Sequence, residues 1–389
     1  MNVPVVAMLF IVFRYPSVIR PALTKKNMIR VLFYALVLIG VFWRLSHMMA
    51  GEILWGEVFL AGYFMVSIGI ILSLLQKFFK KVARKVSGYA KNKHRKYIFI
   101  GMYACFWTFI ILPYVLAVFS VHRPKIGDRV NPKDLLDLEY ETICFKTQDH
   151  LMLEGWFVPQ PSSQQTVIIG HGLGANKSNF ISLVSLWHEW GYHVFIFDFR
   201  GHGHSQGHTL SFGYKESRDI RAALDYLITR NDVDPNGIIG YGVSFGGAAM
   251  IQAAAQDSRI KWVIVDSTFA DFKTMAQKVV AQLRFVPKFL YQSLSELGLI
   301  WAGVEAGCPL TQYSPKDMIR HLKNQPVLII HGKNDRMIPV EEAYQLHQSA
   351  CEPKELYLID AAGHYATLAD RDYEVRILNF LARHKDRSM

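Results

Sequence analysis

A serine flanked by glycines stands between an apolar run and a run of small residues. The pentapeptide is Gly242–Gly246 with Ser244 at its centre, preceded by Gly237–Tyr241 and followed by Gly247–Ile251. This order predicts a buried strand, a very tight turn and a helix, which places the serine at the carboxyl edge of a sheet above a helix N-terminus. Glycines two residues before and after the serine are expected because larger side chains would collide where strand and helix cross. Ser244 is therefore a candidate nucleophile, and the alternative is an ordinary Gly-rich loop.

Two further residues have the chemistry to activate this serine. A serine hydroxyl needs a base within hydrogen-bond reach, and His364 follows the predicted strand Leu356–Ile359. The imidazole in turn needs a carboxylate that fixes its tautomer, and Asp335 follows the predicted strand Val327–Ile330. Asp266 is the rival acid, but the loop that carries Asp335 has the expected length and ends in a proline. The remaining alternative for Asp335 is a helix N-cap.

A tetrahedral intermediate also needs two backbone N–H donors. Phe245 directly follows the serine and supplies one N–H from the helix N-terminus. We expect the second from Leu173, in the turn Gly170–Gly174 that ends another apolar run. His171 in this turn is expected to pack beneath the site as a structural residue.

The histidines and cysteines do not have the spacing of a metal site. His202, His204 and His208 lie close together, but no carboxylate or cysteine ligand is suitably placed beside them. We instead expect a Gly-rich turn held by Asp198 and Arg200, with no metal and no cofactor. The four cysteines, Cys105, Cys144, Cys308 and Cys351, form no CxxC pair, and one disulfide among the last three is left open.

Charge is distributed unevenly along the 389 residues, whose formal net charge is +11. Residues 1–130 hold 18 Lys and Arg against 3 Asp and Glu, whereas the remainder holds 25 against 29. The basic excess thus belongs to the N-terminal third, which is also the most apolar part, a pattern typical of membrane proteins. The rest of the chain has no basic stripe with interleaved aromatic residues, so we expect no binding to nucleic acid.

The predicted membrane region, residues 1–123, contains three candidate transmembrane helices. They lie at about 29–49, 57–76 and 97–121. Residues 77–96 carry nine Lys and Arg and no acid, which favours the cytosolic side for this loop. An integral, multi-pass protein with its remaining chain on the non-cytosolic face follows from these spans. The alternatives are that the first stretch is an interfacial helix, or that all three are core helices of a soluble domain.

Beyond a polar linker at 124–136, short apolar runs alternate with helical stretches through a second domain at 137–389. Its first two runs, 138–146 and 151–158, are typical of an antiparallel pair. Further strands are predicted at 166–170, 194–197, 238–241, 262–265, 327–330 and 356–359, and helices at 177–190, 215–229, 245–255, 340–349 and 371–384. Such alternation predicts an α/β fold with a mostly parallel sheet that helices cover on both faces.

Taken together, these residues resemble the α/β-hydrolase superfamily over about residues 137–383. The motifs that carry the resemblance are His171-Gly172, Asp198–Gly203, Gly242–Gly246, Asp335 and Gly363-His364, in that order. The chain is similar to the branch of serine aminopeptidase-like and monoacylglycerol-lipase-like hydrolases. The run Asp266–Phe272 is similar to membrane-anchored α/β-hydrolase domain-containing proteins. The resemblance implies an eight-stranded sheet, a helical cap and the catalytic triad Ser244, Asp335 and His364.

Residues 272–312 interrupt the alternation and resemble the cap insertion of this family. Their apolar helical face suits an acyl chain, or else packs on the core. We therefore expect a membrane-anchored serine hydrolase that cleaves carboxylic ester or thioester bonds of lipid-like or acylated substrates. A membrane-tethered, aminopeptidase-like serine peptidase is the alternative, for which the cap offers only the acids Glu296 and Glu305. A non-catalytic interaction module is the third hypothesis, and oligomeric state is not predicted by any of these patterns.

Overall fold

The computed structural model describes residues 77, 101–102, 104–282, 286–360, 362–364 and 367–384. The chain divides into two compact units, Met1–Thr108 and Phe109–Met389. Two of the candidate transmembrane helices, 29–49 and 57–76, lie outside the described residues.

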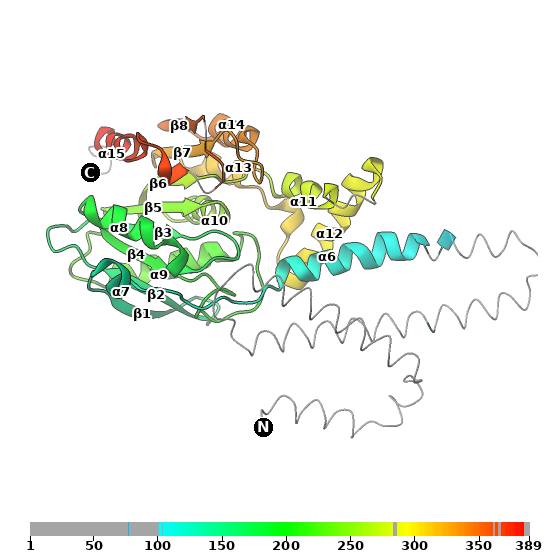
Figure 1. Ribbon diagram of the computed structural model, residues 1–389, viewed down its shortest axis with the longest axis horizontal. Helices are drawn as coiled ribbons and strands as arrows, with labels where there is room; N and C mark the ends of the chain where they lie inside the picture. The colour runs from blue at the N-terminus through cyan, green and yellow to red at the C-terminus, as the bar shows by residue number, and fades with distance from the viewer. Residues whose placement is uncertain are drawn as a thin grey trace, which may run out of the picture. The chain divides into compact units, whose positions relative to one another are not determined.

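The second unit is built on one eight-stranded sheet with the order β1-β2-β4-β3-β5-β6-β7-β8 (Figure 1). The strands are β1 (Glu141–Lys146), β2 (Met152–Val158), β3 (Thr166–Gly170), β4 (His193–Phe197), β5 (Ile238–Val243), β6 (Ile260–Asp266), β7 (Val327–Gly332) and β8 (Lys354–Ile359). β2 runs antiparallel to both of its neighbours, and β3 to β8 pair in parallel. The predicted antiparallel pair and the mostly parallel sheet are thus confirmed.

Short helices precede, connect and follow the strands. They are α7 (Pro132–Leu136), α8 (Ile181–Glu189), α9 (Glu216–Leu227), α10 (Phe245–Ala254), α13 (Pro315–Met318), α14 (Val340–Ser349) and α15 (Tyr373–Arg383), with short 3₁₀ turns before α8 (Lys177–Phe180), after α13 (Ile319–His321) and before α15 (Thr367–Ala369). The five helices predicted in this domain are all present, with ends that differ by a few residues from the predicted ones.

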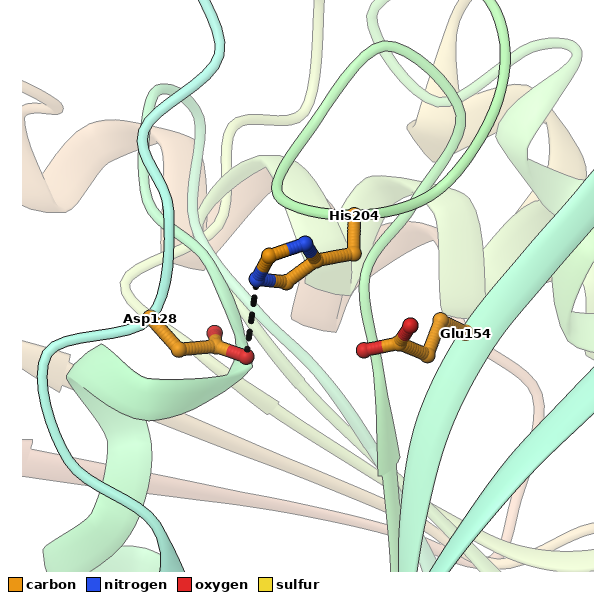
Figure 2. Close-up of side chains that lie close together, drawn as sticks. All are labelled: Asp128, Glu154 and His204. Atoms are coloured by element: carbon orange, nitrogen blue, oxygen red, sulfur yellow. Dashed lines mark ion pairs between the residues drawn. The ribbon is translucent and has the colours of Figure 1, made fainter. Parts of the chain in front are cut away.

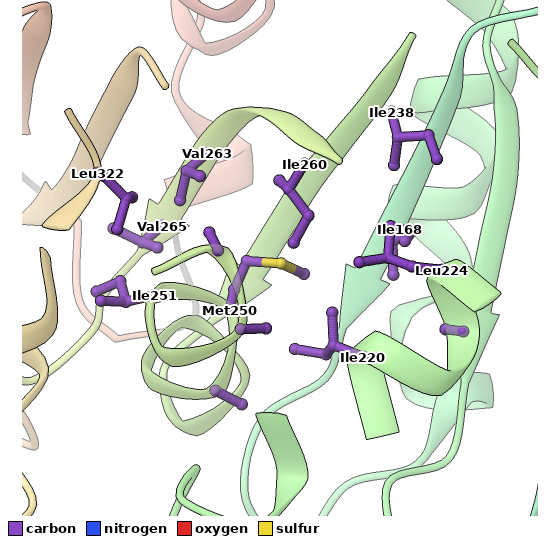
Figure 3. Close-up of a cluster of buried hydrophobic side chains, with 14 of the residues drawn as sticks. Ile168, Ile220, Leu224, Ile238, Met250, Ile251, Ile260, Val263, Val265 and Leu322 are labelled. Atoms are coloured by element: carbon purple, nitrogen blue, oxygen red, sulfur yellow. The ribbon is translucent and has the colours of Figure 1, made fainter. Parts of the chain in front are cut away.

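Apolar side chains lie on both faces of the sheet, because successive residues of a strand point to opposite sides. One layer joins strand residues such as Ile168 and Val263 to α9 and α10, through Ile220 and Met250 (Figure 3). The other layer joins the alternate strand positions to α8 and α15. Strands buried on both faces explain why these runs are continuously apolar in the sequence.

Two segments outside the sheet pack on each other. The first is α6 (Leu112–Val121), which follows a π-helical turn at Trp107–Ile111. The second is the helical insertion after β6, formed by α11 (Phe272–Ala281), a 3₁₀ turn (Lys288–Leu290), α12 (Tyr291–Ala306) and a 3₁₀ turn (Leu310–Gln312). Figure 1 shows α12 lying beside α6.

One helix of the described residues is long and apolar enough to cross a membrane. It comprises the 18 residues Ala104–Val121, whose mean hydropathy is 2.1 and of which 22% are buried. It meets this criterion by its length and composition.

Candidate active site

Ser244 occupies a strained turn between β5 and α10. Its backbone has φ 54° and ψ −115°, a conformation that non-glycine residues rarely adopt. A Cβ added at Gly242 would lie 2.5 Å from the Gly246 carbonyl oxygen, and one added at Gly246 would lie 2.2 Å from the Gly170 carbonyl oxygen. Both glycines are therefore required by backbone crowding, as the sequence pattern predicts.

The structure brings Ser244, His364 and Asp335 together at the carboxyl edge of the sheet. His364 Nε2 lies 3.1 Å from the Ser244 hydroxyl oxygen, and His364 Nδ1 lies 2.7 Å from a carboxylate oxygen of Asp335. The carboxylate accepts from Nδ1–H, which leaves Nε2 unprotonated and able to accept the serine proton. All three residues are buried, so these hydrogen bonds are shielded from bulk water.

Backbone amides hold the Asp335 carboxylate in its ionised form. Its second oxygen accepts from the N–H groups of Met337 and Ile338 at 2.8 and 2.9 Å. Burial raises the pKa of Asp335, but the hydrogen bonds from His364 and from these amides outweigh burial and leave the pKa below its usual value. His331 Nε2 in turn donates to the Ile338 carbonyl at 2.9 Å, which fixes the turn that carries the two amides.

Asp266, the rival acid, has other partners. Its carboxylate accepts from the hydroxyls of Tyr241 and Tyr373 at 3.2 and 3.0 Å, and from Ser267 at 2.9 Å. Among the described residues it is Asp335, rather than Asp266, that pairs with His364.

Two buried imidazoles organise the turn that carries Leu173. His171 Nδ1 donates to the Gly172 carbonyl at 2.8 Å, and its Nε2 accepts from the Phe199 N–H at 3.1 Å. His202 Nδ1 lies 3.1 Å from the Arg200 carbonyl, and its Nε2 accepts from the Gly174 N–H at 3.4 Å. His171 is thus structural, as expected. The Phe245 N–H is the first of α10, where amides lack acceptors within the helix.

Replacing His202 with glutamine should make stability less sensitive to acid. Burial, and then the nearby His171, lower the pKa of His202 to about 3. The unfolded chain, with an ordinary pKa of about 6.5, takes up a proton between pH 6.5 and 3 while the folded protein does not. The contribution of His202 to the free energy of unfolding is therefore fully present above about pH 6.5. It decreases as the pH falls below this value, by about 1.4 kcal/mol per pH unit.

The measurement is the free energy of unfolding of purified protein at several pH values from 4 to 7. His202→Gln should show the shallower slope. His208→Gln, an exposed position on the same loop, should keep the wild-type slope. Equal slopes for all three proteins would contradict the assignment of His202 as a buried neutral imidazole.

A charge cluster that the sequence did not reveal holds the loop beside this turn. Figure 2 shows Asp128, Glu154 and His204 facing one another. One carboxylate oxygen of each acid and one ring nitrogen of His204 all lie within 4.8 Å of one another. The ammonium of Lys177, which is fully buried, lies 2.7 Å from Asp128, 3.1 Å from Glu154 and 2.7 Å from Asp198. A cation of the chain itself therefore bridges the carboxylates. Burial lowers the pKa of Lys177, but Asp198 and Asp128 outweigh burial and raise it.

Asp198 holds the Gly-rich turn in place and also pairs with Lys177. It accepts from the Lys177 N–H at 2.8 Å and from the His204 N–H at 3.0 Å. Arg200 pairs with Asp219 at 2.6 Å and with Asp149 at 2.6 Å. The predicted roles of Asp198 and Arg200 are thus confirmed. No sequence signal indicated Lys177, because its acidic partners are distant along the chain.

Lys177→Met should destabilise the protein strongly. The substitution keeps the length and apolar stem of the side chain but leaves the buried Asp198 carboxylate without its cation, which costs about 3–5 kcal/mol. We expect the melting temperature to fall on the order of 10 °C. The control is Lys133→Met, which breaks exposed ion pairs with Asp137 and Glu139 and should leave the melting temperature nearly unchanged. Similar melting temperatures for both variants would contradict a structural role for the cluster.

Comparisons with known proteins agree with this geometry. Residues 167–376 match the model of the "Alpha/beta hydrolase family". Uncharacterized protein YfhR of Escherichia coli O157:H7 is 30% identical over 287 residues, which cover 70% of this chain and 93% of that protein. Protein bem46 of Schizosaccharomyces pombe is 28% identical over 265 residues, 66% of this chain and 82% of that one.

A solved structure shares the fold. Esterase Pf2001 of Pyrococcus furiosus superposes with a TM-score of 0.57 at 24% identity, over 68% of this chain and 98% of that one. The family model and the similarity to YfhR lead to one conclusion: the chain belongs to the alpha/beta hydrolase family.

Proposed function

We propose that the protein is a membrane-anchored serine hydrolase that cleaves carboxylic ester or thioester bonds of lipid-like or acylated substrates. The observation that carries the proposal is the hydrogen-bonded relay from Ser244 through His364 to Asp335, at 3.1 and 2.7 Å. A complete relay of this kind argues against a non-catalytic interaction module.

In the proposed reaction, His364 Nε2 takes the proton of the Ser244 hydroxyl as its oxygen attacks the substrate carbonyl. The N–H groups of Leu173 and Phe245 stabilise the oxyanion. His364 then protonates the leaving alcohol or thiol, which departs and leaves an acyl group on Ser244. His364 deprotonates a water molecule, which attacks the acyl-enzyme. His364 then returns this proton to the departing Ser244 oxygen, and the acid is released. Asp335 stabilises the imidazolium formed in both steps.

The peptidase alternative needs an acidic group in the cap to bind a free peptide amine. Both cap acids already have partners: Glu296 pairs with Lys273 at 2.6 Å, and Glu305 with His122 at 3.1 Å. The apolar character of α11 and α12 supports an acyl substrate instead. We propose that the anchor lies within the apolar stretch 97–121, whose described part contains the helix Ala104–Val121. The additional spans at 29–49 and 57–76 and a catalytic unit on the non-cytosolic face remain part of the proposal, supported by the positions of the basic loops.

The test is a substrate panel on the purified full-length protein. We expect hydrolysis of acyl esters and thioesters at rates at least 100-fold above those of aminoacyl amides, and fluorophosphonate labelling of Ser244. Faster cleavage of aminoacyl amides than of any ester would favour the peptidase. Turnover of neither class, without fluorophosphonate labelling, would contradict a hydrolase.

A further inference from the structure

The cap hairpin, here defined as α11 and α12, lies beside the apolar helix along most of the described length of that helix. The ring of Tyr114 on α6 packs edge-on against Trp301 on α12, with centroids 5.3 Å apart. At the N-terminal end of α12, Phe109 and Leu112 pack with Leu290 and Leu294. At the C-terminal end of α12, Glu305 pairs with His122. The two helices are therefore parallel, and they run side by side for about 20 Å, given the 1.5 Å rise per residue.

The last turns of α6 belong to the catalytic unit. Ala117, Val118 and Val121 are buried, and Ala117 and Val121 share an apolar cluster with Phe269 beside β6. A bilayer around the apolar helix therefore begins N-terminal to these turns, near residue 116. The apolar sequence from 97 to 116 has twenty residues, which is the length needed to cross about 30 Å of hydrocarbon.

This position fixes the depth of the cap tip, here defined as residues 286–294. Phe109, which packs beside the tip, lies seven residues before 116, or about 10 Å along the helix. That depth is typical of interfacial apolar insertions. The 3₁₀ turn of the tip exposes Lys288 and Phe289, the latter to 81%, and Pro287, Gln292 and Ser293 are the other exposed residues of the tip. At this depth the ring reaches acyl chains, while the lysine side chain can extend toward the headgroups.

Exposed apolar side chains continue along the hairpin and α6. On α12, Ile300 is 51% exposed, and its neighbour Trp301 packs against Tyr114, two residues N-terminal to 116. On the turn before α6, Ile110 is also exposed, six residues N-terminal to 116. Glu296, the acid of α12 nearer the tip, is ion-paired with Lys273 at 2.6 Å.

We propose that the cap tip and Ile300 of α12 insert into the lipid bilayer, so that the cap of the active site is itself a membrane-embedded element. The proposal rests on the proposed membrane anchor and adds to it a second, independent contact with lipid. An acyl chain then reaches the hairpin from the leaflet without crossing water.

The first experiment uses the unmodified full-length protein in phosphatidylcholine–phosphatidylglycerol vesicles that contain a phosphatidylcholine with a diazirine on its acyl chain. After irradiation and digestion, peptides that cover 286–304 should carry lipid adducts at least tenfold more often than peptides from α15, on the other side of the catalytic unit. Adducts on 286–304 that are no more frequent than on α15 would overturn the proposal.

A matched pair of cysteine variants identifies what covers the tip when lipid does not. Phe289→Cys and Val375→Cys each add one thiol at an exposed apolar position, on the tip and on α15 respectively. In vesicles, a polyethylene-glycol maleimide should modify Phe289→Cys at least tenfold more slowly than Val375→Cys, counted as the band added to the wild-type pattern. In SDS both should react fully.

Protection of Phe289→Cys without lipid adducts would mean that protein, from this chain or a second copy, covers the tip. Rapid modification would mean that water does. Either result contradicts the proposal. Neither readout depends on turnover, and both experiments can be repeated on Ser244→Ala. A failure of the proposed hydrolase activity is thereby distinguished from a failure of tip insertion.

Discussion

Replacing Ser244 with alanine is expected to lower ester hydrolysis by about 10⁴-fold or more and to abolish fluorophosphonate labelling. The serine oxygen is the atom that His364 faces at 3.1 Å, so its removal leaves the imidazole without a nucleophile to activate. Residual turnover would come from substrate binding and the backbone N–H groups of Leu173 and Phe245. The measurement is kcat/KM on a short-chain ester that dissolves in water, which avoids any effect of the substrate's membrane partitioning.

Ser295→Ala is the matched control for this variant. Ser295 is a buried serine on α12 whose hydroxyl donates to the Gln292 carbonyl at 2.8 Å. We expect wild-type activity from it, and melting temperatures within a few degrees for both variants. Hydrolysis by Ser244→Ala at the wild-type rate would mean that another residue forms the acyl-enzyme, or that no acyl-enzyme forms.

Asp335→Asn should lower kcat by about 10⁴-fold while the fold is retained. The same change in a serine protease triad has an effect of this size, because the amide imposes the wrong tautomer on the histidine. Here the carboxylate accepts from His364 Nδ1–H and from two backbone amides at once. An asparagine oxygen can still accept from the amides, and its NH₂ group then faces His364. The imidazole must then carry its proton on Nε2, where it cannot accept from Ser244.

The comparison with Asp266→Asn separates the two candidate acids. Asp266 receives hydrogen bonds from Tyr241 and Tyr373, so its replacement should lower the melting temperature and change kcat by less than tenfold. A stopped-flow or steady-state assay on both proteins at pH 8 is sufficient. A 10⁴-fold loss in Asp266→Asn together with a mild effect in Asp335→Asn would reverse the assignment of the acid.

The central sheet and its edge could be predicted from the sequence because local patterns determine them. Strands buried on both faces are continuously apolar, and the positions of Ser244, Asp335 and His364 follow from the rule that parallel strands end at one edge. Gly242 and Gly246 predicted the close crossing of strand and helix, because a side chain at either position would collide with backbone atoms.

Lys177 shows what the local pattern could not reveal. In the sequence it begins a predicted helix at 177–190, where a lysine is ordinary. In the structure it begins a separate 3₁₀ turn, Lys177–Phe180, and its ammonium meets acids from three other segments. Such a cluster forms only when the tertiary fold brings the segments together. The end of the apolar helix is a similar case, since hydropathy does not distinguish a side chain that faces lipid from one that packs in a core.

The burial of Ala117 and Val121 matters to anyone who wishes to prepare the catalytic part alone. Cutting at the polar segment that begins with Pro124 would remove both side chains and expose their neighbours Phe212, Phe269 and Ile338 to water. Val121 also accepts a backbone hydrogen bond from Leu210 at 2.9 Å, which such a cut would break. A shortened protein that begins at Phe109 keeps these contacts of Ala117 and Val121, but it also keeps the apolar helix α6. Removing the apolar helix would favour solubility, whereas keeping the apolar cluster around Ala117 and Val121 intact requires the helix to stay. The choice of the first residue must therefore balance these two requirements.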